Sequence, residues 1–280
     1  MKICRTVEEL LSNVNTLKQS NKTIGLVPTM GALHNGHASL FVRARKENDV
    51  FISSVFVNPV QFNNKEDFEK YPRTEENDIR LLEENGCDIV FIPTAEEVYG
   101  NEEIEEFHFG ELEQVMEGVQ RPGHFSGVAN IVSRLFIWTR ADRAYFGEKD
   151  YQQIAIIKDM VRQKGFNIEI IPCPIYRDED GLATSSRNMR LSEDARKIAP
   201  KIHQILLNSF RQKDNLSINQ IQAYVEDEFK KIKEFELEYF CIVDDTTLQP
   251  VKQRQINQGI VGCIAVWLDG VRLIDIQRYW

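Results

Sequence analysis

Apolar runs alternate with segments of helical spacing through the first two thirds of the chain. Short runs rich in Val, Ile and Phe predict strands at 23–28, 50–57, 88–92, 142–146 and 167–171. Apolar residues at three- and four-residue spacing predict helices at 38–48, 75–85, 127–139 and 151–163. Strands that alternate with helices indicate βαβ units, so we predict an α/β fold with a mostly parallel, doubly wound sheet. Such sheets bind ligands beyond the carboxyl ends of their strands.

The pattern changes after Tyr176. Here we predict two consecutive helices, at 192–213 and 218–233, and then strands at 235–243, 259–268 and 271–276. The last two strands are separated by Asp269-Gly270, which is a strong signal for a hairpin turn. The chain is therefore expected to have two domains, a larger one at 1–176 and a smaller α+β domain at 177–280.

Composition narrows the class of protein. Of the 280 residues, 42% are hydrophobic and 28% are charged, as in an ordinary globular protein. A net charge of −9 argues against a nucleic-acid surface, which usually has a basic excess. No run reaches the roughly 18 apolar residues that a membrane helix needs. Acids at Glu8 and Glu9 stand where a signal peptide has its apolar core. We expect a cytoplasmic protein with no membrane or nucleic-acid partner.

Two histidines three residues apart, His34 and His37, follow the first predicted strand in the larger domain. Residues at this spacing share one face of a helix. The start of a helix offers N–H groups and a positive dipole end to an anion. Two imidazoles at that place predict a site for a nucleoside triphosphate. A structural role and a metal site are the alternatives, but no nearby acid or Cys completes a metal-binding set.

Neither a G-x-G-x-x-G nor a P-loop motif is present, so other segments must help to bind phosphate. One candidate segment lies where a strand meets a helix. Gly147 would allow the main chain to approach a ligand closely. Lys149 could bind a phosphate, and Asp150 could accept hydrogen bonds from ribose hydroxyls. The alternative is a plain turn with a solvated Lys–Asp pair.

Two further segments carry polar side chains suited to small ligands. Ser185, Ser186 and Arg187 could grip a phosphate with several donors, or could simply form a polar loop before the next helix. Asn58 and Gln61 suit a substrate with hydroxyl or carboxylate groups, or could belong to a turn after a strand.

The loop 121–126 (Arg-Pro-Gly-His-Phe-Ser) could be an active-site loop. Alternatively, Ser126 could only be the N-cap of the following helix.

Six ordered motifs resemble those of the pantothenate synthetase (pantoate–β-alanine ligase) family, within the nucleotidyltransferase superfamily that includes class I aminoacyl-tRNA synthetases. They are Pro-Thr-Met-Gly-Ala-Leu-His-x-Gly-His at 28–37, Phe-Val-Asn-Pro-x-Gln-Phe at 56–62, Tyr-Pro-Arg-Thr at 71–74, Arg-Pro-Gly-His-Phe at 121–125, Gly-x-Lys-Asp-x-Gln-Gln at 147–153 and Ser-Ser-Arg-Asn at 185–188. One His-x-Gly-His indicates only the superfamily, but six motifs in order are specific.

The resemblance implies a Rossmann-like domain, a C-terminal lid domain and, typically, a homodimer. It implies condensation of pantoate with β-alanine, using ATP and Mg²⁺, through pantoyl adenylate to pantothenate, AMP and pyrophosphate. The residues implied to bind ATP are Met30, His34, His37, Gly147, Lys149, Asp150, Tyr176, Ser185, Ser186 and Arg187. Those implied to be catalytic are His34, His37, Lys149 and Arg187. Those implied to bind pantoate are Pro28, Met30, Gln61 and Gln153.

The resemblance also implies a mobile wall at 63–73, including Tyr71, that excludes water from the adenylate. One position departs from the family, which often has two acids after Tyr-Pro-Arg-Thr as Mg²⁺ ligands. Here the pair is Asn77-Asp78. Mg²⁺ keeps several waters and relies on substrate phosphates, so Asp78 alone is expected to contact it.

Two other functions stay open from the residues. A nucleotidyltransferase could attach AMP or CMP to a phosphorylated substrate and stop, but it would give no reason for the paired amides Gln61 and Gln153. A non-catalytic nucleotide sensor would bind ATP without turnover.

Overall fold

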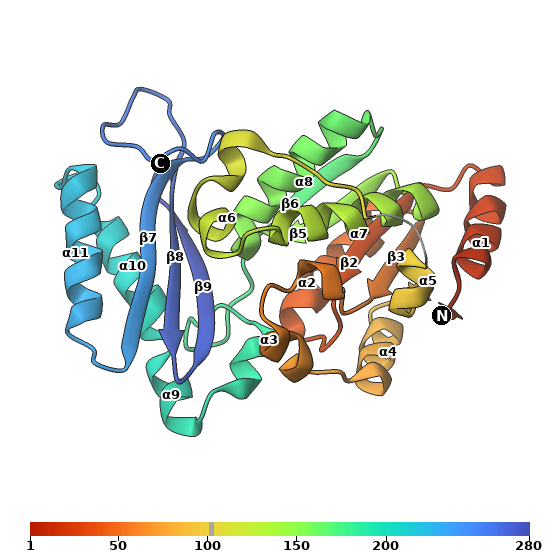
Figure 1. Cartoon of the computed structure of the whole chain (residues 1–280), viewed down its shortest axis with the longest axis horizontal. Coiled ribbons are helices and arrows are strands. Elements are labelled where there is room, and N and C mark those ends of the chain that lie inside the picture. The colour runs from red at the N-terminus through yellow and green to blue at the C-terminus, as the bar shows by residue number, and fades with distance from the viewer. Residues whose placement is uncertain (101–103) are drawn as a thin grey trace. The chain divides into compact units, whose positions relative to one another are not determined.

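The computed structural model describes residues 1–100 and 104–280 (Figure 1). They form two compact units. The first consists of Met1–Phe109, Gln120–Gly147 and Gln153–Cys173. The second consists of Gly110–Val119, Glu148–Gln152 and Pro174–Trp280. Two short segments from before residue 174 thus belong to the second unit. The domains 1–176 and 177–280 stay a prediction.

The first unit contains a six-stranded sheet in which every strand pair is parallel, in the order β1-β4-β3-β2-β5-β6. The strands are β1 (Lys2–Cys4), β2 (Ile24–Thr29), β3 (Val50–Val55), β4 (Ile89–Phe91), β5 (Arg143–Gly147) and β6 (Glu169–Cys173). From β2 the chain builds β3 and β4 on one side, and β5 and β6 on the other. Beyond β2 and β5 lies the switch point where such sheets bind ligands. The predicted fold class is confirmed.

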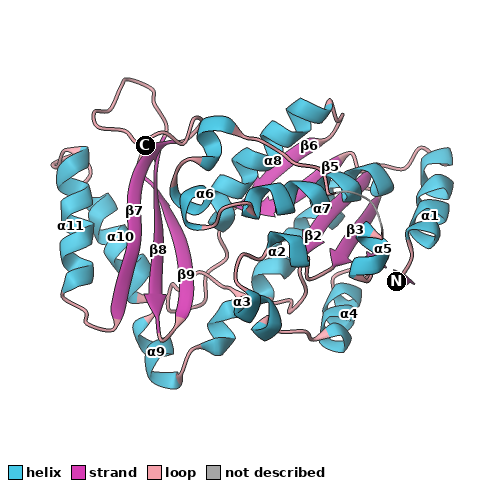
Figure 2. Cartoon of the chain, in the orientation of Figure 1, coloured by secondary structure: helices cyan, strands magenta, loops and turns pink. Residues whose placement is uncertain are grey.

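Helices cover both faces of this sheet (Figure 2). Those of the first unit are α1 (Val7–Gln19), α2 (Asn35–Glu47), α3 (Lys65–Lys70), α4 (Glu75–Glu84), α5 (Ala95–Tyr99), α7 (His124–Thr139) and most of α8 (Tyr151–Lys164). Successive residues of a strand point to opposite faces. Val90 packs in the cluster that contains Leu40 of α2 and Leu82 of α4. Its neighbour Phe91 meets Trp138 of α7, with ring centroids 5.7 Å apart. The sheet is therefore buried on both sides.

Several predicted details are corrected. The alternation pattern did not predict β1 or α1, although Thr6 and Glu9 form a capping box at the start of α1. Ser126 is not the N-cap of the helix that follows 121–123: α7 begins at His124, and its N-cap is Gly123. The left-handed φ of 78° at Gly123 explains why a glycine serves there.

The second unit contains an antiparallel sheet of three strands, β7 (Phe235–Asp244), β8 (Ile260–Leu268) and β9 (Val271–Arg278). Its helices are α9 (Glu193–Ile198), α10 (Lys201–Arg211), α11 (Ile218–Lys230) and most of α6 (Met116–Gln120). Asp269 and Gly270 have φ values of 53° and 68°, as the predicted hairpin turn requires. The α10 and α11 helices pack with this sheet around a common apolar core.

The helix predicted at 192–213 is wrong as a single helix. It is broken into α9 and α10, and Pro200 is the N-cap of α10. Proline has no N–H, and its ring collides with the carbonyl of the preceding turn, so the helix cannot continue through it. In the described parts of the chain, no helix has the length and apolar character needed to cross a membrane.

Candidate functional site

The turn after β2 contains two residues with positive φ, Gly31 at 80° and Ala32 at 48°. Asp78, which is only 2% exposed, holds this turn. Its carboxylate accepts hydrogen bonds from the N–H groups of Ala32 at 3.0 Å and Leu33 at 2.8 Å. The Thr74 hydroxyl donates to the same carboxylate at 3.0 Å. Both carboxylate oxygens are therefore engaged in fixing the start of the histidine motif.

The two histidines themselves build the first turn of α2. Nδ1 of His34, the N-cap, accepts the N–H of Gly36 at 3.1 Å, and Nδ1 of His37 accepts the N–H of His34 at 3.3 Å. A ring nitrogen that accepts carries no proton, so the neutral rings have their proton on Nε2. The ring centroids lie 4.0 Å apart. Two imidazole rings thus stand together at the positive end of α2, a place that suits anionic oxygens.

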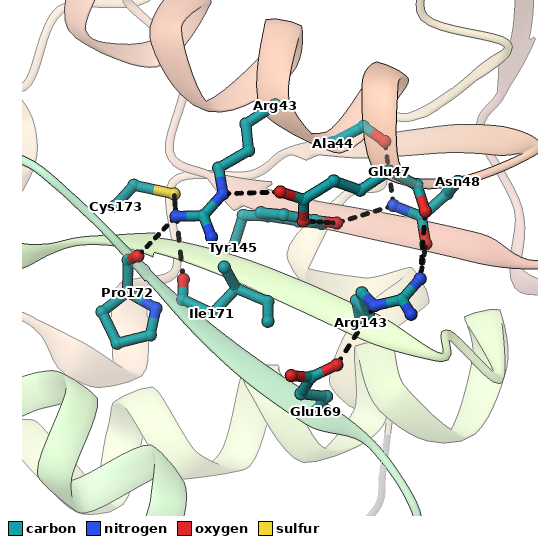
Figure 3. Close-up of polar contacts among 10 residues, drawn as sticks. All are labelled: Arg43, Ala44, Glu47, Asn48, Arg143, Tyr145, Glu169, Ile171, Pro172 and Cys173. Carbon is teal, nitrogen blue, oxygen red and sulfur yellow. Dashed lines mark hydrogen bonds and ion pairs between the residues drawn. The ribbon is translucent and has the colours of Figure 1, made fainter.

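The far end of α2 is fastened to β5 and β6 (Figure 3). Arg43 donates to the carbonyl of Pro172 at 2.8 Å and to Glu47 at 2.9 Å. Tyr145 donates to Glu47 at 3.0 Å and accepts from Asn48 at 2.7 Å. The bond from Arg43 lowers the pKa of Glu47, and burial raises the pKa of Tyr145 to about 12. This network is ionised at Glu47 and protonated at Tyr145 near neutral pH, and it holds α2 against the sheet.

Gln61 lies at the end of a short 3-10 turn, η1 (Pro59–Gln61). Its Nε2 donates to Sδ of Met30 at 2.9 Å, so the structure brings these two predicted pantoate contacts together. Its Oε1 accepts from Asn58 at 3.1 Å. Asn58 is 1% exposed and also accepts the Tyr99 hydroxyl at 2.6 Å. Burial raises the pKa of Tyr99 to about 12, so this donor keeps its proton. Tyr99 belongs to none of the six motifs, and the sequence has no local signal for its contact with Asn58.

The other predicted residues of the first unit lie on several of its elements. Pro28 and Met30 are half-buried, within and just after β2. Gly147 ends β5, and a Cβ added there would meet no atom within 4 Å, which leaves room for a ligand. Gln153 is half-buried in the first turns of α8. Tyr71 is 6% exposed and packs edge-on against Phe62, with centroids 5.7 Å apart.

The second unit carries the other predicted phosphate and nucleoside ligands. Nζ of Lys149 lies 3.3 Å from Oδ2 of Asp150, and the Lys149 side chain is 21% exposed. Ser185 caps the turn 186–190 and accepts the N–H of Arg187 at 3.3 Å. Ser186 is buried, Arg187 is half-buried and Tyr176 is exposed. Of the two alternatives, the Lys–Asp pair forms, although Lys149 is mostly buried rather than solvated, and the polar turn forms as described; the binding roles remain predictions.

A metal held by protein side chains does not fit the turn after β2. The Asp78 carboxylate is buried, and its oxygens accept three hydrogen bonds. Among residues 1–100 and 104–280, no group of three or more His, Cys, Asp or Glu side chains is arranged to hold a metal ion. Asp78 as an Mg²⁺ ligand stays a prediction, and its hydrogen bonds favour a role in holding the turn.

The parallel sheet, its switch point and the imidazole pair are together typical of α/β enzymes that act on anionic substrates. The chain matches the family model of pantoate-beta-alanine ligase over residues 2–278. It belongs to the pantoate-beta-alanine ligase family, as the six motifs predicted.

Relatives in sequence and in structure support this membership over the whole chain. It is 51% identical over 280 residues to the pantothenate synthetase of Phocaeicola vulgatus, covering 100% of this chain and 99% of that one. Pantothenate synthetase from Thermus thermophilus superposes with a TM-score of 0.94 at 40% identity, covering 100% of both chains. Pantoate-beta-alanine ligase from Francisella tularensis, complexed with beta-gamma ATP and beta-alanine, has a TM-score of 0.83 at 37% identity, covering 100% of this chain and 98% of that one.

Proposed function

We propose that the protein condenses pantoate with β-alanine, using ATP, to give pantothenate, AMP and pyrophosphate through pantoyl adenylate. The observation that carries the proposal is the Met30–His37 turn. Met30 at one end contacts the carboxamide of Gln61, and His34 and His37 stand together at the other end, at the start of α2. A contact for a small carboxylate substrate and a contact for phosphate therefore belong to one short, braced segment. Family membership and the ligands of the Francisella tularensis relative support the same reaction.

The roles that we propose for individual residues follow the family motifs. The triphosphate would be held by His34, His37, Lys149, Ser185, Ser186 and Arg187. The rest of ATP would be held by Met30, Gly147, Asp150 and Tyr176. Pantoate would be held by Pro28, Met30, Gln61 and Gln153. Residues 177–280 would act as a lid and Tyr71 as part of a gate. His34, His37, Lys149 and Arg187 would act catalytically because they neutralise charge on phosphoryl oxygens.

The chemistry needs no nucleophile from the protein. A carboxylate oxygen of pantoate attacks the α-phosphorus of ATP, an O–P bond forms, and the bond to pyrophosphate breaks. The neutral amine of β-alanine then attacks the acyl carbon, a C–N bond forms, and the C–O bond to AMP breaks. The amine proton passes to solvent. Positioning and charge neutralisation account for most of the rate in such transfers.

We also propose a metal, a cellular compartment and an oligomeric state for the reaction. Mg²⁺, when bound, would supply neutralisation of phosphate charge, and Asp78 would not be needed to hold it, because its oxygens hold the turn. We further propose a cytoplasmic homodimer that acts without nucleic acid or membrane.

A product assay tests the function. Purified protein is mixed with ATP, Mg²⁺, pantoate and β-alanine, and AMP, pyrophosphate and pantothenate are quantified together. Equal amounts of the three products, only with both substrates, are expected. Pyrophosphate without amide product would indicate a transferase with another acceptor, and ATP binding without turnover would indicate a sensor.

A further inference from the structure

His124 contacts the main chain of the residue that we propose to bind pantoate. His124 is the first residue of α7 and is 6% exposed. Nδ1 of His124 lies 2.7 Å from the carbonyl oxygen of Gln61. A carbonyl oxygen can only accept, so Nδ1 carries the proton and donates it to Gln61.

Arg121 fixes the opposite side of the same ring. Its Nη1 lies 3.1 Å from Nε2 of His124. A guanidinium can only donate, so Nε2 accepts and is unprotonated. The ring is therefore neutral, in the one tautomer that offers Nδ1–H to Gln61. A hydrogen bond from a charged donor is stronger than one between neutral groups, so Arg121 stabilises this orientation of His124.

Close packing couples the main chain of Gln61 to α7, the helix that His124 opens. A Cβ added at Gly127 would lie 2.6 Å from the carbonyl oxygen of Val60 and 2.7 Å from Cα of Gln61. Only glycine permits this approach. Asn58 then donates both to the carbonyl of Gly127 at 3.0 Å and to Oε1 of Gln61 at 3.1 Å. The main chain of Gln61 is thus held by α7, and its side chain is held by Asn58.

We propose that His124 is a positioning residue for pantoate: its Nδ1–H fixes the Gln61 carbonyl and so aims the Gln61 carboxamide at the substrate. The role rests on the proposed function, because Gln61 meets pantoate only in that reaction. It accounts for the loop 121–126, to which the proposed chemistry assigns no other task. A displaced carboxamide weakens the binding of pantoate, whereas most of the residues proposed for ATP lie on other segments of the chain and stay in place.

Two substitutions separate this role from simple packing. In His124→Asn, the carboxamide nitrogen takes the place of Nδ1, so the bond to Gln61 can be kept. In His124→Gln, the longer side chain reaches toward the place of Nε2, and that bond is lost. The KM for pantoate, the KM for ATP, kcat and the midpoint of thermal unfolding are measured for each variant.

His124→Gln is expected to raise the KM for pantoate about 5- to 30-fold while the KM for ATP stays within about twofold, and His124→Asn should return the pantoate KM to within about threefold of wild type. The role is overturned if His124→Gln leaves the pantoate KM unchanged, raises both KM values equally, or is matched by His124→Asn. If His124→Gln does not fold, Arg121→Met is decisive: a rise of about 2- to 5-fold in the pantoate KM alone supports the role, and no change overturns it.

The failure of this role differs from the failure of the proposed function. If wild-type protein makes pantothenate and the substitutions leave the KM for pantoate unchanged, the positioning role alone is overturned. Wild-type protein that forms no pantothenate overturns both.

Discussion

The carboxylate of Asp78 accepts the main-chain N–H of Leu33 at 2.8 Å, across 45 positions of sequence. Together with its bond to Ala32, this contact fixes the left-handed turn that leads into the histidine pair. The family resemblance predicts that Asp78 contacts a metal, whereas the structure shows that it binds main-chain N–H groups. A metal ligand and a main-chain acceptor are expected to respond differently to substitution.

Asp78→Asn should weaken the turn because the amide must direct N–H toward one of the main-chain donors. We expect a loss of about 1–3 kcal/mol in the free energy of unfolding and at least about a tenfold fall in adenylate formation. The Mg²⁺ concentration for half-maximal rate should stay within about twofold, since the metal is not displaced. Denaturant unfolding and an Mg²⁺ titration of pyrophosphate release measure both. Unchanged stability with a strongly raised Mg²⁺ requirement would identify Asp78 as a ligand instead.

Substitutions of His34 separate helix capping from phosphate binding. His34→Asn keeps an acceptor at the N-cap, so its stability should lie within about 1 kcal/mol of wild type. It loses the Nε2–H donor, so adenylate formation should fall roughly 10²-fold. His34→Ala should lose the same activity and also about 0.5–2 kcal/mol of stability. An active His34→Asn enzyme would show that the ring acts only as a cap.

Lys149→Ala should leave the fold intact and reduce adenylate formation by roughly 10²-fold or more, because a fixed positive charge for the phosphates is lost. Its side chain is only 21% exposed and is paired with Asp150. Lys158→Ala, at an exposed position of α8, is the matched control and should keep full activity. Circular dichroism and pyrophosphate release are compared for the two variants. Near-normal activity in folded Lys149→Ala would remove this lysine from the site.

Alkaline pH should destabilise the protein through its buried tyrosines. Burial raises the pKa of Tyr99, Tyr145 and Tyr279 to about 12, above the ordinary value of 10.0. A group whose folded pKa is raised favours folding below its unfolded pKa, and that stability is lost as the pH rises through the folded pKa. The urea midpoint should therefore fall between about pH 10 and 12. Tyr99→Phe should flatten this fall, whereas Tyr176→Phe, on the surface, should not. Equal slopes would argue against a shifted Tyr99.

The parts of this protein that depend on local pattern were predictable, and those that depend on distant contacts were not. The alternation of apolar runs predicted the parallel sheet, and Asp269-Gly270 predicted the last hairpin. Pro200 is itself a local signal for a helix break, but the helical pattern on both sides of it favours one continuous helix. Capping residues at Thr6 and Glu9 could likewise have predicted α1.

The candidate site divides in the same way. The motifs predicted that His34 lies at the start of a helix after β2 and that Gln61 lies after the end of β3, and the structure has both residues there. Asn58 is close to Gln61 in sequence, but Tyr99 reaches Gln61 through Asn58, and His124 lies 63 positions away. Local spacing does not predict such contacts, because they form between distant elements: Tyr99 belongs to α5, and α7 packs against η1 through Gly127. Substrate roles for these residues remain predictions.

Oxygen transfer from pantoate to AMP tests the central claim most directly. If the pantoate carboxylate attacks the α-phosphorus and the C–O bond later breaks, one carboxylate oxygen must end in AMP. Pantoate labelled with ¹⁸O in its carboxylate is turned over with ATP and β-alanine, and the products are analysed by mass spectrometry. The account predicts one ¹⁸O in AMP for each pantothenate formed. Unlabelled AMP, or label in inorganic phosphate together with ADP, would contradict it.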